Sequence, residues 1–256
     1  MLLAIDVGNT NTVMALLDNG QIIRQRRLST VHTRTVDEYA ILTHSLLAEP
    51  PADSILTSVV PAVTAPLAQH CQALTGTPPI LIGDRTVTIG VTVDMRAPRE
   101  VGADRLVNTR AVIDRFSTPA IIIDIGTAAT FDTINAQGHY IGGVIAPGPM
   151  IAFDALRRQA ALLPQVLIEK PPAAIGVDTV TAMQSGLYWG YIDLVTGLTR
   201  RIIAEMDTKP AVIATGGATR PFIDSLEVVD HFEPDLTLYG LYRIWCENRD
   251  TPRSER

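Results

Sequence analysis

The feature that most constrains this chain is an internal repeat. An apolar, strand-like run ending in Asp-x-Gly occurs at residues 2–8 and again at residues 120–126. Each copy continues with a second apolar run, a turn containing glycine and a third strand-like run. The matching pairs are all 118 positions apart: Asp6 with Asp124, Gly8 with Gly126, Thr12 with Thr130, and Gly20 with Gly138. This spacing is far longer than a solenoid repeat, so it indicates a duplicated domain.

Strand triplets followed by helical patterns, occurring twice, predict an α/β protein with mixed sheets flanked by helices. The glycine turns at Gly20 and Gly138 predict β-hairpins. Apolar periodicity predicts helices over residues 35–47 and 179–203, the second capped by Asp178 or Thr179. We place the domain boundary near residues 117–119. This gives an N-terminal domain of residues 1–117 and a C-terminal domain of residues 118–256, with a cleft between them.

Composition limits the partners. The chain has 256 residues, is 46% hydrophobic and carries a formal net charge of −6. It has no basic cluster, which argues against nucleic acid as a partner. No run of about 18 apolar residues and no signal peptide is present, so we expect no membrane span and a cytoplasmic location. The two cysteines, Cys71 and Cys246, show no metal-ligand spacing. An acidic protein that binds an anionic nucleotide must attract it locally, through backbone N–H groups and a metal ion.

The first copy of the repeat carries a candidate phosphate-binding turn. Gly8 allows a tight turn and close approach of an anion to the backbone. The side chains of Asn9, Thr10 and Thr12 add donors beside the backbone N–H groups. Asp6, at the strand end, is placed to hold Mg²⁺ directly or through water. The alternative is an ordinary hairpin in which Asp6 caps the turn.

The second copy repeats this turn at Asp124, Gly126 and Thr127, and two such turns can clamp nucleotide phosphates across the cleft. The sequence contains no P-loop motif, so such a clamp would differ from a P-loop. A further glycine pair, Gly216-Gly217, follows the apolar run 211–213 and allows the backbone to pass close to a flat ligand such as adenine. The alternative for this pair is a simple turn between strand and helix.

The segment Gly102-Ala103-Asp104-Arg105 opens a predicted helix. A helix N-terminus can bind a carboxylate of a substrate, and Arg105 can pair with it bidentately. Asp104 can accept a proton from a hydroxyl group. An Asp–Arg salt bridge at the start of a helix is the competing interpretation, and spacing alone favours it.

Together these motifs resemble the type III pantothenate kinases, and the resemblance runs from residue 1 to about residue 248. It rests on the order and spacing of six motifs, which are residues 6–10, 102–105, 124–128, 179–186, 215–217 and 236–238. The resemblance implies the actin-like fold shared by acetate and sugar kinases. It also implies transfer of phosphate from ATP to pantothenate, the first committed step toward coenzyme A, by a homodimer that needs Mg²⁺ and a monovalent cation, K⁺ or NH₄⁺.

By the same resemblance, the ATP phosphates bind residues Asp6, Val7, Gly8, Asn9, Thr10, Asn11, Thr12 and Val13. Pantothenate is held by Gly102, Ala103, Asp104 and Arg105, with Asp104 as the proton acceptor. Asp124 binds the monovalent cation, Thr127 contacts ATP and Thr179 contacts pantothenate. Many members have a tyrosine that contacts pantothenate at the position of Met95.

Two other functions fit the same motifs. One is a kinase for another small hydroxy acid or sugar, because this fold serves many substrates. The other is an inactive regulatory homologue. Retention of Asp6, Asp104 and Asp124 argues against an inactive protein.

Overall fold

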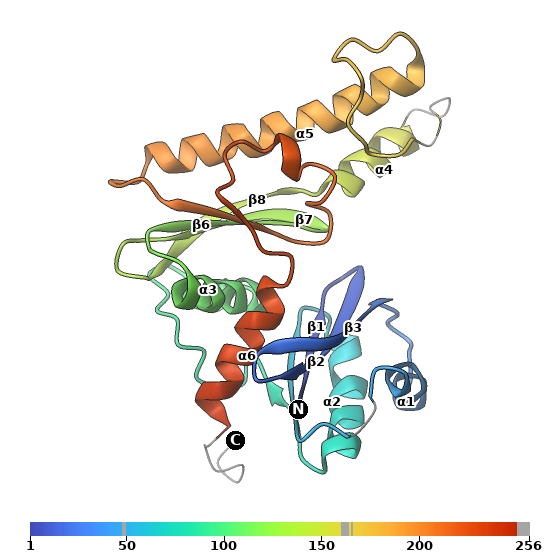
Figure 1. Cartoon of the computed structure of the whole chain (residues 1–256), viewed down its shortest axis with the longest axis vertical. Coiled ribbons are helices and arrows are strands. Elements are labelled where there is room, and N and C mark those ends of the chain that lie inside the picture. The colour runs from blue at the N-terminus through green and yellow to red at the C-terminus, as the bar shows by residue number, and fades with distance from the viewer. Residues whose placement is uncertain (48–49, 160–163, 165, 250–256) are drawn as a thin grey trace. The chain divides into compact units, whose positions relative to one another are not determined.

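The structure, a computed structural model, describes residues 1–47, 50–159, 164 and 166–249 (Figure 1). The chain divides into two compact units. The first comprises Met1–Val91, Ala97–Arg115 and the chain from Leu236 onward, and the second comprises Thr92–Arg96 and Phe116–Asp235. The chain passes from the first unit to the second between Arg115 and Phe116, beside the predicted boundary at residue 117. It differs from the predicted division in two segments, because the last helix belongs to the first unit and residues 92–96 belong to the second.

The first unit contains a five-stranded mixed sheet in the order β3-β2-β1-β4-β5. β2 pairs antiparallel with both β1 and β3, whereas β1, β4 and β5 run parallel. A left-handed glycine, Gly20 with φ of 82°, turns the β2–β3 hairpin as predicted. The strands are β1 (Leu2–Val7), β2 (Asn11–Asp18), β3 (Gln21–Ser29), β4 (Asp53–Ser58) and β5 (Ile80–Leu81).

Helices cover both faces of this sheet. Alternation along β1 sends Leu3, Ile5 and Val7 into a core with α1 (Val36–His44) and α2 (Pro61–Thr75). Leu2 and Ala4 point the other way, into a core with α3 (Ala103–Arg115) and α6 (Leu236–Asn248). The buried apolar residues of α6 complete this second core, which explains why the chain returns to the first unit. A short 3₁₀ helix, η1 (Pro98–Glu100), precedes α3.

The second unit repeats the same topology, with the strand order β10-β9-β6-β7-β8. β7 pairs antiparallel with β6 and β8, and β6, β9 and β10 run parallel. Its strands are β6 (Ala120–Ile125), β7 (Ala128–Ile134), β8 (Tyr140–Pro147), β9 (Ala211–Thr215) and β10 (His231–Phe232). Its helices are α4 (Pro149–Gln159), α5 (Thr179–Ala204) and the 3₁₀ helix η2 (Ile223–Ser225). The two units therefore confirm the predicted duplication of an α/β domain with a mixed sheet.

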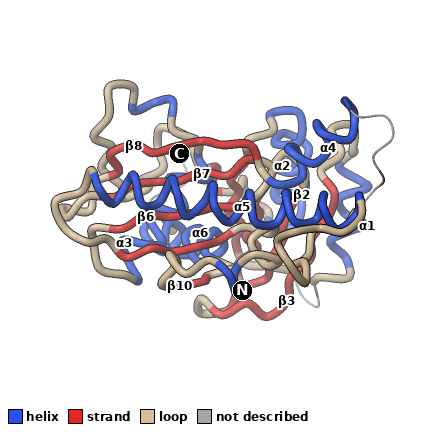
Figure 2. The backbone as a smooth tube through the Cα atoms, turned by 90° about the horizontal axis from the view of Figure 1, so that it is seen from above, coloured by secondary structure: helices blue, strands red, loops and turns tan. Residues whose placement is uncertain are grey.

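The long helix α5 lies across the sheet of the second unit (Figures 1 and 2). It buries Tyr188, Tyr191 and Val195 against the β6 and β7 side chains Ile121, Ile123 and Phe131. Asp178 caps its first turn, as predicted, and the helix ends one residue beyond the predicted residue 203. The helix predicted over residues 35–47 begins after its N-cap Thr35 but ends at His44. Among the described residues, no helix is both long enough and apolar enough to cross a membrane.

Candidate active site

The predicted phosphate-binding turn lies between β1 and β2 in the first unit. The Gly8 N–H donates to the Asn11 carbonyl at 2.9 Å and closes the turn. A Cβ at Gly8 would lie 3.3 Å from that same carbonyl oxygen, so the turn leaves little room for a larger residue. Asn9 and Thr10 are exposed at its tip, whereas Thr12 is fully buried. The exposed tip thus offers backbone N–H groups and two polar side chains to a ligand.

Thr30, which the sequence analysis missed, holds this turn from the end of β3. Its hydroxyl donates to the Gly8 carbonyl at 2.7 Å and lies 3.0 Å from the Thr12 hydroxyl. Its N–H donates to the Thr10 carbonyl at 2.9 Å. The register of the β2–β3 hairpin is the sequence signal that could have identified Thr30. A bulge between Leu16 and Leu17 shifts this register, and because the bulge cannot be placed from the sequence, the residue that faces the turn could not be predicted.

Asp6 is a half-buried acid at the end of β1, just before the turn. Its neighbours in the sheet are Val13 on β2 and Thr57 on β4. Residues paired in this way have side chains on the same face, which here is the face covered by α3 and α6. Thr57 is fully buried, and its hydroxyl has no hydrogen-bond partner. The Asp6 carboxylate is a hard oxygen donor of the kind that Mg²⁺ prefers.

The first unit also carries the predicted acceptor-binding segment at the start of α3. α3 begins at Ala103, and the Leu106 N–H donates to the Gly102 carbonyl at 3.2 Å. Asp104 and Arg105 are half-buried in the first helical turn. The Asp104 Oδ1 accepts the Arg105 N–H at 2.9 Å, which fixes the carboxylate at the helix N-terminus. A Cβ at Gly102 would lie 2.6 Å from this Oδ1, so glycine leaves space for the carboxylate.

In the second unit, three loops meet at the turn between β6 and β7. The Gly126 N–H donates to the Ala128 carbonyl at 2.8 Å, so this turn is one residue shorter than the first, in which Gly8 donates to Asn11. Gly148, which precedes α4, donates to the Thr127 carbonyl at 3.1 Å. A Cβ at Gly148 would lie 2.3 Å from the carbonyl oxygens of both Gly126 and Thr127. Only glycine permits this close packing of two backbones.

Gly216 brings the third loop against Asp124. It has φ of 93°, and a Cβ there would lie 2.3 Å from Asp124 Oδ1. The Ala218 N–H donates to the Ile125 carbonyl at 2.9 Å and holds the loop in place. Gly217 and Thr127 are exposed beside the half-buried Asp124. The structure thus brings predicted residues from two separate motifs together beside the Asp124 carboxylate.

Two remaining predicted residues, Met95 and Thr179, also belong to the second unit. Met95 is 36% exposed, in a segment that pairs with Tyr140 through Val93. Thr179 is the first residue of α5 and lines an apolar groove with Leu156 of α4 and Leu187 of α5. Its neighbour Asp178 accepts the Thr181 N–H at 2.8 Å, and this hydrogen bond lowers the pKa of the Asp178 carboxyl.

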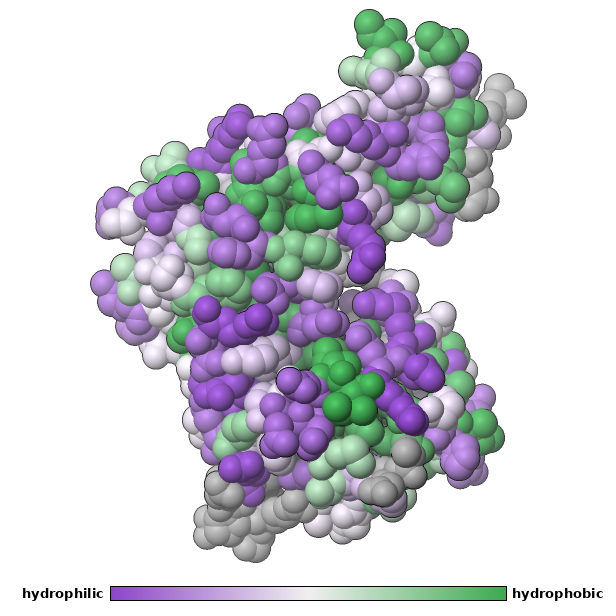
Figure 3. Space-filling model, in the orientation of Figure 1, coloured by the Kyte–Doolittle hydropathy of each residue, from purple (hydrophilic) through white to green (hydrophobic). Residues whose placement is uncertain are grey.

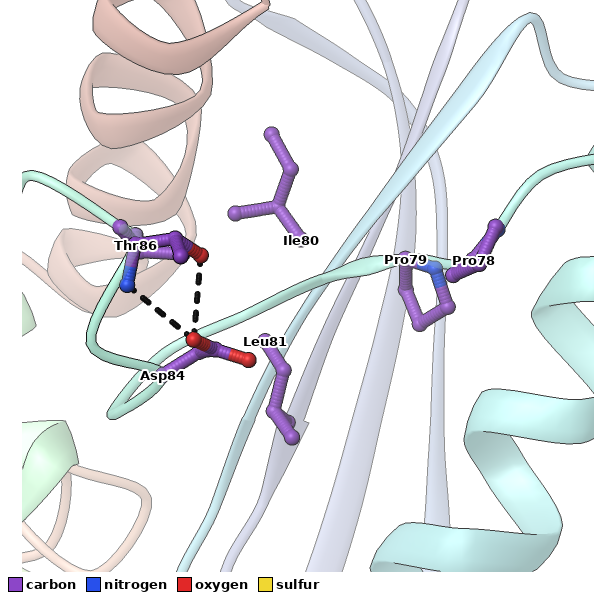
Figure 4. A pocket seen from close by; sticks show the side chains of 7 residues that line it. Pro78, Pro79, Ile80, Leu81, Asp84 and Thr86 are labelled. Carbon is purple, nitrogen blue, oxygen red and sulfur yellow. Dashed lines mark hydrogen bonds between the residues drawn. The ribbon is translucent and has the colours of Figure 1, made fainter. Parts of the chain in front are cut away.

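A second pocket lies elsewhere in the first unit, beside β5 (Figure 4). It is lined by Pro78, Ile80 and Asp84, among others. Asp84 accepts hydrogen bonds from the backbone N–H and the hydroxyl of Thr86, at 3.1 and 3.0 Å. The backbone hydrogen bond is the main cause of the lowered pKa of Asp84. None of the predicted site residues lines this pocket.

No group of three or more His, Cys, Asp or Glu side chains within the described part of the chain is arranged to hold a metal ion.

Comparison with known proteins identifies close relatives along the whole chain. A family model described as type III pantothenate kinase matches residues 2–201. The type III pantothenate kinase of Rhodospirillum centenum is 46% identical over 258 residues, covering 97% of this chain and 99% of its own length. That of Geotalea uraniireducens is 42% identical over 257 residues, covering 98% of this chain and 100% of its own length.

Solved structures share the fold at low sequence identity. A Campylobacter jejuni protein described as a putative Baf family transcriptional activator has a TM-score of 0.60 at 18% identity, covering 97% of this chain and 99% of its own. A putative 2-dehydro-3-deoxygalactonokinase from Sinorhizobium meliloti has a TM-score of 0.56 at 11% identity, covering 96% and 99%. These likenesses confirm the predicted actin-like fold of the sugar kinases.

Proposed function

This chain belongs to the type III pantothenate kinase family, and we propose that it transfers the γ-phosphoryl group of ATP to the primary hydroxyl of pantothenate. The product is 4′-phosphopantothenate, the first intermediate on the route to coenzyme A. The observation that carries this proposal is the end-to-end match, at 42–46% identity, to kinases of this name. The retained acids at both turns and at the start of α3 support it, because phosphoryl transfer depends on positioning and charge.

The turn between β1 and β2 is our proposed site for the ATP phosphates. Residues 6–13 include the exposed N–H groups at the tip, and the hydrogen bonds from Thr30 hold that tip in one shape. We assign the magnesium ion of Mg·ATP to Asp6, directly or through water. When bound, that ion neutralises charge on the β- and γ-phosphates. A pre-shaped turn reduces the entropy lost on binding, which favours nucleotide affinity.

Asp104 is our proposed general base. The Arg105 N–H holds Asp104 Oδ1, so the carboxylate has a defined orientation from which to accept the proton of the pantothenate hydroxyl. Gly102, Ala103 and Arg105 bind the acceptor beside it, with the Arg105 guanidinium directed at the pantothenate carboxylate. We assign Met95 and Thr179 to the same acceptor. Met95 supplies an apolar, flexible contact in place of the hydroxyl-bearing ring of many family members.

In the second unit, we assign Asp124 to a monovalent cation, K⁺ or NH₄⁺. The close approach of Gly216 to Asp124, and of Gly148 to the Gly126 and Thr127 carbonyls, supports a compact cluster of oxygen ligands there. Thr127, Gly216 and Gly217 then contact ATP, with the glycines leaving room for the nucleotide. The ion supplies positive charge that favours binding of the anionic nucleotide to this acidic protein. ATP as phosphoryl donor fits a cytoplasmic location.

A homodimer is supported by exposed apolar side chains of the second unit. Ile145, Leu167, Ile175 and Val177 are 65%, 74%, 84% and 91% exposed. In Figure 3, hydrophobic surface gathers over the loop that precedes α5. Exposed apolar side chains that gather on a surface are typical of a protein interface. We propose that a second copy of the chain covers it.

A coupled assay of ADP formation tests the function. The purified chain, Mg·ATP and pantothenate are combined with and without K⁺, and a panel of sugars and other hydroxy acids replaces pantothenate in parallel. We expect turnover with pantothenate, increased by K⁺. Turnover with another acceptor alone identifies a different kinase of the same fold. ATP binding without turnover on any acceptor favours a regulatory protein.

A further inference from the structure

Thr57 on β4 is a buried polar residue without a structural explanation. The residue is fully buried, and its hydroxyl has no hydrogen-bond partner. A buried hydroxyl left unpaired destabilises the fold. Such a group suggests a partner that is present only in the working protein, because valine would fill the same space without this cost.

The sheet places this hydroxyl beside the acid at the phosphate-binding turn. Thr57 pairs with Asp6 in the parallel register of β1 and β4, so the two side chains lie side by side on one face. Two residues earlier, Ile55 lies on that face in the dry core shared with Val107 of α3. Thr57 therefore lies at the edge of the apolar core, next to the half-buried Asp6. This is the position from which a side chain can support Asp6 from the interior.

The second unit repeats the pairing of an acid at a strand end with a buried threonine. Asp124 pairs with Thr215 in the parallel register of β6 and β9, and Thr215 is 2% exposed. The two threonines are farther apart in the sequence than the two acids, because α4, α5 and their connections separate β8 from β9. The repeat of 118 positions in the sequence therefore does not relate Thr57 to Thr215. Both copies of the domain nevertheless place a buried threonine beside their acid.

We propose that Thr57 is a positioning residue for the magnesium ion of Mg·ATP, an inference that rests on the proposed function. Its hydroxyl donates its one hydrogen bond to the Asp6 carboxylate, the ligand that we assign to the ion. A hydrogen bond to an ionised acceptor is stronger than one between neutral groups. Magnesium also requires near-octahedral geometry, so an oriented carboxylate binds it better than a mobile one. With the ion bound, this hydrogen bond would satisfy the buried hydroxyl.

The test measures binding and stability rather than turnover. Thr57→Val removes the hydroxyl and nearly preserves the shape, whereas Thr57→Ser keeps the hydroxyl. Affinity for a non-hydrolysable ATP analogue is measured by calorimetry, with Mg²⁺ and with EDTA and without pantothenate. We expect Thr57→Val to weaken binding of the magnesium complex by on the order of tenfold, the usual effect of losing a group that orients a metal ligand. Binding in EDTA and the affinity of Thr57→Ser should stay near those of the wild type.

Ser54 provides the matched control. It lies on the same strand, is fully buried and also carries a hydroxyl group. The spacing of three residues places it on the opposite face from Thr57. We expect Ser54→Ala to leave binding of the magnesium complex unchanged.

Stability without ligand gives a second readout. Because Thr57→Val removes an unpaired hydroxyl, its denaturant midpoint should equal or exceed that of the wild type. Equal affinity of Thr57→Val and wild type for the magnesium complex overturns the proposal. Unfolding of the valine variant also overturns it, since the hydroxyl would then be needed by the ligand-free fold. Magnesium-dependent binding by a wild type that does not phosphorylate pantothenate refutes the proposed function and leaves the assignment of Thr57 standing.

Discussion

Asp104 illustrates how much of the site depends on one side chain. The same residue serves as an acid in the first turn of α3 and as the proposed proton acceptor. Its Oδ1 is oriented by the adjacent Arg105 N–H, and Gly102 leaves space for it. The salt-bridge interpretation of the sequence explains neither the glycine nor the backbone hydrogen bond. At this scale, local backbone geometry supports a chemical role for the carboxylate.

Asp104→Asn should separate catalysis from binding. The amide keeps the shape but cannot accept the hydroxyl proton, so we expect kcat to fall on the order of 10²–10⁴-fold. Affinity for Mg·ATP, measured by calorimetry, should stay within about twofold of the wild type because the phosphate-binding turn is untouched. Asp37→Asn is the control, since Asp37 is an exposed acid in the first turn of α1. Full turnover of Asp104→Asn would exclude Asp104 as the base.

Gly216→Ala should damage the cation site of the second unit. The new Cβ would lie 2.3 Å from Asp124 Oδ1, at a φ of 93° that alanine rarely adopts. We expect the Asp124 carboxylate to move, K⁺ activation to be largely lost and the KM for ATP to rise. Gly83→Ala is matched in backbone strain, with φ of 101°, but its Cβ would meet nothing within 4 Å. Gly83→Ala should lose about 1 kcal/mol of stability and keep K⁺ activation; equal K⁺ activation in both variants contradicts the assignment.

At the scale of elements, α1 and α2 are joined by a buried polar contact. The His70 Nε2 on α2 lies 2.7 Å from the Thr43 hydroxyl on α1, and both residues are almost completely buried. Burial lowers the pKa of His70, because the charged ring loses its hydration. The folded protein therefore keeps this ring neutral at a pH where an unfolded chain binds a proton.

The stability contributed by His70 should fall in mild acid. Its lowered pKa in the folded state means that the contribution is complete above the unfolded value of about 6.5 and is lost as pH falls below it. We expect the difference in unfolding free energy between wild type and His70→Gln, from urea titrations, to shrink between about pH 7 and pH 5. For the control His32→Gln, at an exposed site, the difference in unfolding free energy from the wild type should stay constant over the same pH range. A constant difference for His70→Gln across this range would contradict the burial argument.

At the scale of the whole molecule, assembly is the property most open to test. Two of the exposed apolar residues of the second unit, Ile175 and Val177, shortly precede Thr179, which we assign to the acceptor. Ile175→Glu with Val177→Glu should convert a dimer to a monomer, because burying two carboxylates in an interface is unfavourable. Sedimentation velocity measures the mass. Ile41→Glu on α1 changes a residue of similar exposure, 75%, in the first unit and should leave the mass unchanged. A wild-type monomer, or a double variant that stays dimeric, would contradict the proposed interface.

The sequence alone determined the duplication, the two acidic turns and the helices α1, α3 and α5. Each of these depends on neighbours in the chain: apolar alternation, a glycine at a hairpin, or a capping residue such as Asp178. Local physics acts over a few residues, so it is visible in the linear order. The constant spacing of Asp6 and Asp124 adds one long-range relation, because duplication copies a whole segment.

The tertiary structure alone decided which distant residues support those turns. Thr30 reaches its turn through a register that a bulge sets, and Thr57 reaches Asp6 through a parallel pairing across a long connection. Gly148 and Gly216 approach their partners only because two loops fold onto the same strand end. The return of α6 to the first unit likewise depends on an apolar face that several elements share. Such pairings depend on packing free energy summed over the whole core, and no short stretch of sequence encodes that sum.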